Sequence, residues 1–381
     1  MDVNTKMLLH KKFCDYYQRH TVPAPNEIEF REFGVGNLNT KIKVRHKSFR
    51  SERDMQAFLR REAPYYISYS AAYYEFPQNP IKDKRWKGAE LIFDLDVPMK
   101  LLNSKKLQEV KDEALKLLQL LYEDFGISKE KIAVNFSGCK GYHIHVFDET
   151  VRTLGKDERR EIVDYVTGKT DVRALLKFQG HTDEIYAGPK QGDVGWSGRI
   201  YKELHIFLSN ATEKELQEIP KIGAKKAQTI IEKRQQILKA LESGRYDLMP
   251  WLIDINRKKD GSIIDASSPI MTNLINHLAV HFSSESTDEM VTIDTSRLIR
   301  LPNTIHGGSG LIAKTVKELE SFNPLIEAVA FGKEAMTLEV LEDVDVFEIG
   351  ESKHGPFKIG ERIELPEYAG MYLLLHWAPE R

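Results

Sequence analysis

The sequence predicts a mixed α/β (α+β) fold, in which a mixed β-sheet core is flanked by helices and interrupted by a helical insertion. Three observations predict it: short segments that alternate apolar and polar residues, long amphipathic segments between them, and short β-like runs beyond about residue 337. With 381 residues, 41% of them hydrophobic, the chain can bury a large core and a smaller module. We therefore predict a core of residues 1–156 and 282–336, a largely helical insertion of residues 157–281 and a small β domain of residues 337–381.

The first hundred residues predict a helix, a strand and a second helix ahead of the central strand. Apolar residues at helical spacing indicate the first helix (Leu8, Leu9, Phe13, Tyr16 and Tyr17), Thr40 to Val44 alternate as a strand, and Ser51 caps the second helix. Basic residues gather in the same region: Lys41, Lys43, Arg45, Lys47, Arg50, Arg53, Arg60 and Arg61. They indicate either a track for nucleic-acid phosphates or an ordinary solvated face.

The segment ELIFDLDVP predicts a strand that presents two carboxylates on one face. Leu91, Phe93, Leu95 and Val97 alternate with Ile92, Asp94 and Asp96, and Pro98 ends the strand. At about 3.3 Å per residue, the Cα atoms of Asp94 and Asp96 are roughly 6.6 Å apart, close enough for both side chains to bind divalent cations. An acidic pair on a strand is also a common surface feature, so this motif alone is weak evidence.

A helix and a strand–turn–strand unit follow. An amphipathic helix capped by Ser104 and ended by Gly126 should cover the sheet. Ile132 to Phe136 and Tyr142 to Phe147 then read as strands joined by the turn Ser137-Gly138-Cys139-Lys140-Gly141. Ser137, Lys140 and His143 offer a hydroxyl, a cation and an imidazole for phosphate oxygens, although an ordinary hairpin turn would look similar. His145 reads as a structural histidine, and nothing nearby supports Cys139 as a nucleophile.

The third polar cluster is TIDTSRLIRLPNTIH. Met290 to Asp294 reads as a short strand that ends in a carboxylate, and Leu298 to Leu301 as a second strand. We expect Asp294 to be the third metal ligand, and Arg300 and His306 to reach the same phosphates. An arginine paired with a core carboxylate and a histidine that caps a loop are the alternative interpretation.

Within the insertion, Thr212 and Glu215 form a capping box that opens a helix. The following segment, IPKIGAKKAQTII, looks like a helix-hairpin-helix element, which holds a DNA phosphate with backbone amides, although Lys221 replaces the first expected glycine. A plain helical turn is the alternative. Beyond residue 337, LEVLEDVDVFEIG, GPFKIGERIELP and MYLLLHWAP read as β-like runs.

Taken together, these motifs resemble a family, the catalytic small subunit of the archaeal and eukaryotic replicative DNA primase. The resemblance covers most of residues 1–335 and rests on FREFG, WKGAELIFDLD, SGCKGYHIHVFDE, RLIRLPNTIHGGSGLIAK and FNPLIEAV. It implies the archaeo-eukaryotic primase fold and template-directed nucleotidyl transfer with two Mg²⁺ or Mn²⁺ ions, giving RNA primers, and DNA primers as an alternative, on single-stranded DNA. The implied metal ligands are Asp94, Asp96 and Asp294, and the implied nucleotide ligands are Ser137, Lys140, His143, Arg300 and His306.

The resemblance also implies partners. The expected partners are the iron-sulfur primase large subunit, in a heterodimer, and NTPs or dNTPs as substrates. Residues 337–381 are similar to the B domain of the GINS replication complex and are expected to dock a replisome partner, or else to be a β extension packed on the core. Cys14 and Cys139 are the only cysteines, too few for a cysteine-rich zinc site or an iron-sulfur cluster, so we expect no structural zinc.

The low cysteine content and the absence of an apolar stretch of membrane length predict a cytoplasmic protein with no membrane partner. The net charge of −2 is unusual for a nucleic-acid enzyme unless the basic residues are concentrated, as they are ahead of the acidic strand, and the resemblance implies a nucleoid-associated protein. Two rival functions remain open. A primase-polymerase of the kind attached to bacterial repair ligases would share the three clusters, whereas FREFG, FNPLIEAV and the C-terminal module favour the replicative enzyme. A catalytically silent nucleic-acid scaffold is disfavoured because all the acidic and phosphate-binding residues are present.

Overall fold

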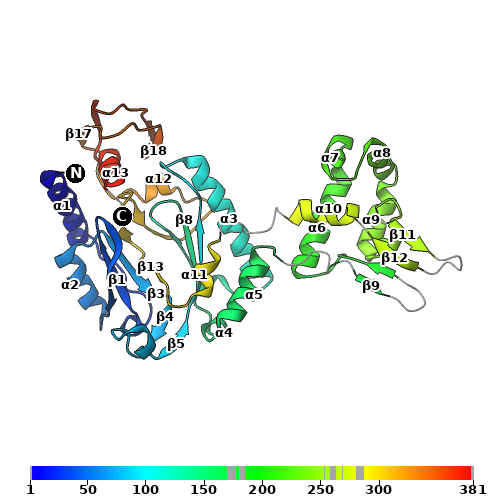
Figure 1. Cartoon of the computed structure of the whole chain (residues 1–381), viewed down its shortest axis with the longest axis horizontal. Helices are drawn as coiled ribbons and strands as arrows, with labels where there is room; N and C mark the ends of the chain where they lie inside the picture. The colour runs from blue at the N-terminus through cyan, green and yellow to red at the C-terminus, as the bar shows by residue number, and fades with distance from the viewer. Residues whose placement is uncertain are drawn as a thin grey trace. The chain divides into compact units, whose positions relative to one another are not determined.

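The structure described is a computed structural model of the chain. In it the chain folds into two compact units (Figure 1). The first unit contains residues 1–118, 127–163 and 285–381, and the second contains residues 119–126 and 164–284. Helices and antiparallel sheets occur in both units, which confirms the predicted mixed α/β fold class. The residues that the structure describes are 2–169, 175, 177–179, 185–252, 254–257, 263–267, 269–279 and 287–378.

One four-stranded antiparallel sheet of the first unit has the strand order β13-β3-β1-β2. Helix α1 packs its predicted apolar face into the core that also contains Phe33, Ile67 and Ile299 of this sheet. Helix α2 begins as predicted, because the Ser51 side chain accepts the N–H of Asp54 at 3.2 Å. The elements are α1 (Val3–Arg19), β1 (Phe33–Asn37), β2 (Thr40–Lys47), α2 (Glu52–Glu62), β3 (Tyr66–Ser70) and β13 (Leu298–Arg300).

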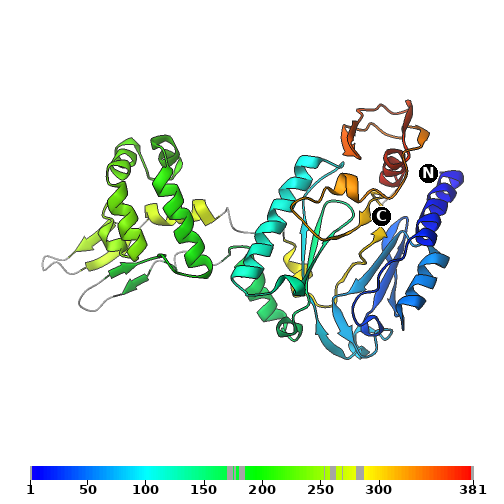
Figure 2. The same ribbon diagram turned by 180° about the vertical axis from the view of Figure 1, so that it is seen from behind.

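The second four-stranded sheet has the order β16-β7-β8-β6, and β6 pairs antiparallel with β8. Its strands are β6 (Leu91–Asp96), β7 (Ile132–Phe136), β8 (Gly141–Val146) and β16 (Thr315–Val316). The predicted alternation of β6 is confirmed at its end, where Phe93 and Leu95 are fully buried while Asp94 and Asp96 are partly exposed. Figures 1 and 2 show α1 and α2 on the outer side of the first sheet and α3 (Ser104–Glu123) on the outer side of the second.

The start of α3 differs from the prediction by one residue. The side chain of Asn103, not of Ser104, accepts the N–H of Lys106, at 3.0 Å. The backbone N–H of Ser104 instead donates to the carboxylate of Glu348, at 2.8 Å. Asparagine and serine are equally good N-caps, so the sequence alone could not decide between two adjacent candidates.

Shorter elements complete the first unit. Strand β4 (Ala72–Tyr74) pairs with β5 (Trp86–Ala89), and β14 (Thr304–Ile305) pairs with β15 (Ile312–Ala313). The remaining helical segments are η1 (Ile28–Phe30), η2 (Ile81–Asp83), η3 (Lys129–Lys131), α4 (Glu149–Arg152), α5 (Lys156–Val166) and α12 (Pro324–Glu327).

The predicted strand from Met290 to Asp294 is wrong, because these residues lie in and just after helix α11 (Glu289–Ile293). The Asp288 side chain accepts the N–H of Met290 at 3.0 Å and so caps the helix. Asp294 is the residue that follows the helix, and its N–H still donates to the carbonyl of Met290 at 3.0 Å. The β-branched residues of this segment suggested a strand, but the acidic cap at Asp288 decided the local structure.

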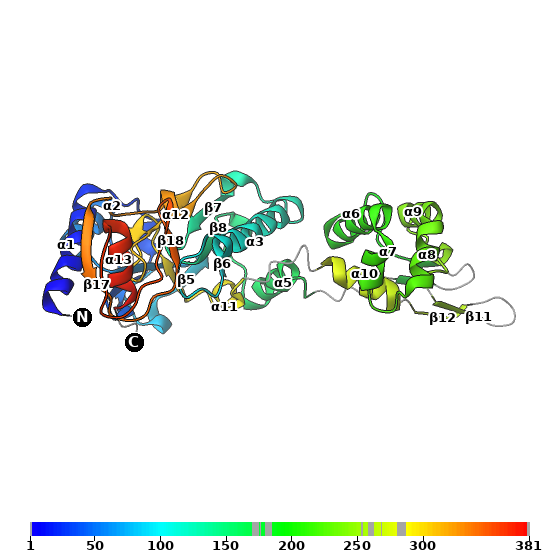
Figure 3. The same ribbon diagram turned by 90° about the horizontal axis from the view of Figure 1, so that it is seen from above.

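The segment from residue 337 onward is not purely β, which corrects the predicted small β domain. Strand β17 (Ala335–Glu339) pairs with β20 (Arg362–Pro366), and β18 (Phe347–Ile349) pairs with β19 (Ser352–His354). The final apolar run is helix α13 (Glu367–His376), which lies beside α1 and β17 (Figure 3). Because α13 is buried on all sides, its sequence lacks the amphipathic period that marks a surface helix.

The second unit is mainly helical and has its own apolar core, which includes Trp196, Leu204, Ile237 and Leu274. The predicted capping box is confirmed, with Thr212 and Glu215 exchanging hydrogen bonds at the start of α7. Its elements are β9 (Lys177–Gln179), β10 (Ile185–Ala187), α6 (Gly195–Asn210), α7 (Glu213–Glu218), α8 (Ala224–Glu232), α9 (Arg234–Ser243), η5 (Tyr246–Leu248), β11 (Asp254–Arg257), β12 (Ile263–Ser267) and α10 (Pro269–Ala279). No helix in the described part of the chain is long and apolar enough to cross a membrane.

Candidate active site

A cavity of about 520 Å³ in the first unit is lined by residues of both four-stranded sheets. It brings together seven residues that the sequence predicts for the site, contributed by three distant segments: Asp94, Asp96, Ser137, Lys140, His143, Arg300 and His306. Asp294, the eighth predicted residue, is not among the described residues that line this cavity. The structure thus assembles both predicted phosphate-binding groups around the acidic pair.

The two aspartates share one end of strand β6. The register places Asp94 opposite His143 and Asp96 opposite Gly141 on β8. Lys140 Nζ lies 3.5 Å from Asp96 Oδ2, and His143 Nε2 lies 3.5 Å from Asp94 Oδ1. The acidic pair and two of the candidate phosphate ligands are therefore neighbours across a single strand pair.

The environment of Asp94 disfavours its charge. Burial, and then the like charges of Asp96 and Asp288, raise the pKa of Asp94 to about 7. Burial also raises the pKa of Asp96, although the nearby Lys140 ammonium opposes that rise. Within the described residues, the buried Asp94 Oδ1 has no hydrogen-bond partner. Such a carboxylate pair is stabilised either by protons or by a bound cation.

The turn between β7 and β8 is tightly built. The Ser137 hydroxyl accepts the N–H of Gly141 at 3.1 Å, and the Ser137 N–H donates to the Gly141 carbonyl at 2.9 Å. Gly138 has a φ of +87°, which favours glycine, and a Cβ at Gly141 would overlap the carbonyl oxygen of Leu95. Burial raises the pKa of Cys139 to about 11, so its thiol stays protonated and is a poor nucleophile.

Two of the histidines that line the cavity, His143 and His306, are neutral. Burial is the main cause that lowers the pKa of both His143 and His306 well below the ordinary value, and the Arg300 charge adds to it. A neutral His143 forms no ion pair with Asp94. For His306, the N–H of Gly308 donates to Nδ1 at 3.1 Å, which leaves the proton on Nε2. His306 can therefore donate a hydrogen bond to a phosphate oxygen without carrying a charge.

Asp288, which we did not predict, adjoins strand β6, although neither it nor Asp294 is among the described residues that line the cavity. Its backbone N–H donates to the Asp94 carbonyl at 2.7 Å, and its charge raises the pKa of both Asp94 and Asp96. The carboxylate of Asp294 instead accepts hydrogen bonds from the N–H and hydroxyl of Ser296, at 3.0 and 2.7 Å. The only local signal at Asp288 was its helix-capping position; its approach to β6 depends on the long-range pairing of Thr287 with Leu95.

The donor set of the cavity fits a divalent cation at Asp94 and Asp96. Both carboxylates face the same cavity, and Asp94 has a buried oxygen without a hydrogen-bond partner within the described residues. Hard cations such as Mg²⁺ prefer such oxygen ligands, and they often retain several waters beside one or two carboxylates. Across the part of the chain that the structure describes, no group of three or more His, Cys, Asp or Glu side chains is arranged to hold a metal ion.

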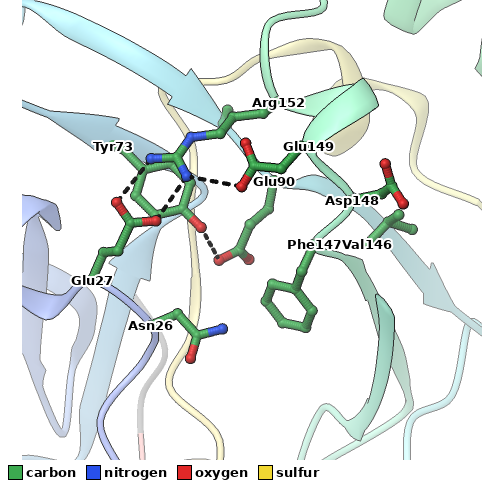
Figure 4. Close-up of a pocket in the computed structure, with 10 residues that line it drawn as sticks. Asn26, Glu27, Tyr73, Glu90, Val146, Phe147, Asp148, Glu149 and Arg152 are labelled. Carbon is green, nitrogen blue, oxygen red and sulfur yellow. Dashed lines mark hydrogen bonds and ion pairs between the residues drawn. The ribbon is translucent and has the colours of Figure 1, made fainter. Parts of the chain in front are cut away.

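A polar network surrounds Glu90, next to the acidic strand, and Figure 4 shows four of its members, Glu27, Tyr73, Glu90 and Arg152. Glu90, which directly precedes β6, forms an ion pair with Arg31 and a 3.0 Å hydrogen bond with His145 Nδ1. Tyr73 donates to Glu90 at 3.3 Å, and its ring lies under Arg152, which binds Glu27 through two hydrogen bonds of 2.8 Å. Arg31 belongs to the FREFG motif, so this motif anchors β6 and leaves the cavity to other residues.

The basic residues that precede the acidic strand do not all face the cavity; some form ion pairs elsewhere. Lys41 lines the cavity. Arg45 pairs with the buried Glu32 at 2.9 Å, and Arg61 pairs with Glu62 at 2.8 Å. Only part of the run can therefore serve as a phosphate track, and Lys41 is the one member of the run among the described residues that line the cavity.

The chain is similar to known proteins over most of its length. The family model described as DNA primase small subunit matches residues 93–318. The DNA primase small subunit PriS of Methanococcoides burtonii is 36% identical, over 100% of this chain and 99% of the relative. The protein of the same name from Methanothrix thermoacetophila is 34% identical over 98% of both chains, and that from Archaeoglobus fulgidus is 34% identical over 97% of both.

Proposed function

Because this chain belongs to the family of DNA primase small subunits, which are DNA-directed nucleotidyltransferases, we propose that it synthesises short RNA primers on single-stranded DNA. We propose DNA primers as a second product of the same site. The observation that carries the proposal is the single cavity in which an acidic pair faces five groups suited to a triphosphate. The name small subunit in the relatives supports a heterodimer, and we propose an iron-sulfur large subunit as the partner.

In the proposed reaction, Asp94 and Asp96 hold Mg²⁺ or Mn²⁺, which when bound lowers the pKa of the attacking 3′-hydroxyl and neutralises the leaving pyrophosphate. Lys140 and Arg300 supply fixed positive charge for the triphosphate. Ser137 and the neutral His143 and His306 supply directional hydrogen bonds. Because these groups are held by strands and tight turns, they orient the α-phosphate before reaction.

The first experiment is unprimed synthesis on single-stranded DNA with labelled nucleotides and Mg²⁺ or Mn²⁺, with and without the large subunit. The wild type is compared with the double variant Asp94→Asn, Asp96→Asn. We expect short products from the wild type and none from the variant. Extension of supplied primers only would favour the gap-filling enzyme of the repair-ligase type, and no synthesis in any mixture would favour a scaffold.

We propose Asp288 as the third carboxylate of the site, and we retain Asp294 as the alternative predicted from the sequence. The charge of Asp288 on Asp94 and Asp96 supports this choice. We expect Asp288→Asn to lower kcat more than about 100-fold, equivalent to about 2.7 kcal/mol of transition-state stabilisation, and Asp294→Asn to change it only a few-fold. Steady-state kinetics over a metal titration measures both variants in parallel, and the reverse order of effects would restore Asp294.

Two further surfaces extend the proposal. The turn between α7 and α8 is proposed to contact DNA; Lys221 has a φ of +74° there, the conformation that a glycine would otherwise supply. Residues 337–381 are proposed to dock a replisome partner. Leu341, Val346 and Ile359 support this role, because they are 49%, 47% and 68% exposed although apolar.

A further inference from the structure

The last turn of helix α13 forms part of the wall of the active-site cavity. Leu375, His376 and Ala378 line it together with the acidic pair and the five candidate phosphate ligands. None of the motifs singled out in the sequence for phosphate or metal binding includes these residues. From the sequence, residues 337–381 were expected either to dock a partner or to pack on the core. Their place in the cavity wall suggests that they also contribute to the site itself.

Helix α13 is anchored beside the turn that carries Lys140. The Tyr372 hydroxyl accepts the N–H of Leu102 at 3.1 Å. Burial raises the pKa of Tyr372, and the neighbouring Cys139 of the turn adds to the rise. Met371 and Leu375 are fully or almost fully buried in the core that α1 and the first sheet share. The helix therefore cannot leave the site without disrupting the core.

The same helix also packs against the turn that carries His306. A Cβ on Gly310 would lie 3.1 Å from Leu375 Cδ1. The two turns meet each other as well, because the Ser309 hydroxyl donates to the Gly138 carbonyl and a Cβ on Gly138 would lie 2.8 Å from His306 Cβ. The end of α13 thus lies against both turns that carry the candidate phosphate ligands.

His376 is the polar side chain that α13 presents to this cavity. Its ring stacks on that of Tyr372, with centroids 5.8 Å apart and an interplanar angle of 28°. The side chain is only partly buried, and among the described residues its ring has no hydrogen-bond partner. A histidine oriented by stacking, with free ring nitrogens in a phosphate-binding cavity, is suited to bind an oxyanion.

We propose that His376 is a further nucleotide-contacting residue, which donates a hydrogen bond from its imidazole to a phosphate oxygen of the bound nucleoside triphosphate. This inference rests on the proposed function and adds to it a residue far along the chain from the three motifs. It assigns to α13 a direct part in substrate binding, in addition to its packing role.

The test is equilibrium dialysis of labelled ATP and adenosine against the full chain, with wild type, His376→Ala, His376→Phe and His376→Gln. His277→Ala is the matched control, because His277 occupies the last turn of α10 in the second unit. We expect the Kd for ATP to rise about tenfold in the Ala and Phe variants and to stay near the wild-type value in the Gln variant and the control. Adenosine binding should not change. Unchanged melting temperatures check that each variant is folded.

The outcomes separate this inference from the proposed function. If the wild type binds ATP and His376→Phe binds it equally well, the ring only packs and the inference is overturned. If adenosine binding weakens as much as ATP binding, the contact is not to phosphate and the inference is also overturned. If the wild type binds no nucleotide, the proposed function fails, whatever the variants do.

Discussion

Asp94 shows how the fold places a carboxylate where its charge is unfavourable. It lies on a strand whose neighbours Phe93 and Leu95 are fully buried, and two other aspartates add their negative charge to its surroundings. A protein gains nothing in stability from such a group. This is typical of a functional residue, since sites for cations are often destabilising until the cation binds.

We predict that Asp94→Asn stabilises the protein when divalent cations are absent. The pKa of Asp94 rises from 3.8 to about 7 on folding, so its neutral form is favoured in the folded state. Relative to Asn, which cannot ionise, the wild type should lose stability as the pH rises from about 4 to about 7, by up to about 4 kcal/mol, with no further loss above pH 7. Denaturant unfolding at pH 5 and pH 8 in EDTA measures the difference.

Added Mg²⁺ provides the control for this prediction, because it should stabilise the wild type at pH 8 and leave Asp94→Asn unchanged. Parallel stability curves for the two proteins across the pH range would show that the charge of Asp94 does not destabilise the fold, and would contradict the prediction.

At the scale of single residues, the sequence could group the candidate site residues where one strand or one turn carries them. Asp94 and Asp96 share a strand face, and Ser137, Lys140 and His143 share a turn and its following strand, so a local period was enough to group them. Asp288 was missed because its approach to Asp94 depends on a bridge between Leu95 and Thr287. No local pattern encodes such a distant pairing.

Among the elements, helix α3 has an unusually complete N-terminus. Asn103 caps it from within the same segment, while the Glu348 carboxylate, brought by β18, accepts the N–H of Ser104. The hydrogen bonds with Ser104 are the main reason that the pKa of Glu348 lies below its ordinary value. An anion at the positive end of a helix dipole explains why this carboxylate stays ionised.

We predict that Asn103→Ala lowers the free energy of unfolding by about 1 kcal/mol, the usual cost of losing an N-cap. The exposed Asn39, in the turn between β1 and β2, provides the matched control, and Asn39→Ala should change stability by less than about 0.5 kcal/mol. Chemical denaturation of both variants at pH 7 makes the comparison. Equal effects of the two substitutions would show that Asn103 is not the cap.

Two elements were assigned the wrong type from the sequence, for different reasons. Helix α11 is short and rich in β-branched residues, so its strand-like composition outweighed the cap at Asp288. Helix α13 is apolar on every face because it is buried between α1 and the C-terminal strands, and a uniformly apolar run does not distinguish a strand from a helix. Long amphipathic helices and alternating strands, such as α3 and β6, were predicted correctly because one of their faces remains polar.

Considered as a whole, the molecule contains a second unit inserted in the sequence of the first. The second unit includes residues 119–126, from the end of α3 and the loop after it. These residues are hydrogen-bonded to α6. The Arg199 guanidinium donates to the Asp124 carboxylate at 3.0 Å and to the Glu123 carboxylate at 2.9 Å. The side chains of Arg199 and Asp124 are only 8% and 6% exposed, so their pairing is largely shielded from water.

We predict that Arg199→Ala destabilises the second unit by about 3 to 5 kcal/mol, because it leaves the largely shielded Asp124 carboxylate without its cationic partner, although the Tyr165 hydroxyl still donates to it at 3.0 Å. Hydrogen exchange followed by mass spectrometry should show faster exchange in α6 and α9 and unchanged protection in β6 and β8. Lys214→Ala, an exposed change in α7 of the same unit, is the control and should leave exchange unchanged. If Arg199→Ala reduced exchange protection equally in both units, the units would not be separately stable, and the prediction would be wrong.

The position of α13 has a consequence for how the enzyme is made. Helix α13 follows every other described element in the sequence, yet it lines the cavity that the acidic strand begins to form near residue 94. Domains fold as the ribosome releases them, from the N-terminus onward. The second unit can therefore fold before the first unit has completed the wall of this cavity. A nascent chain interrupted before α13 has emerged would carry all three motifs around an unfinished cavity.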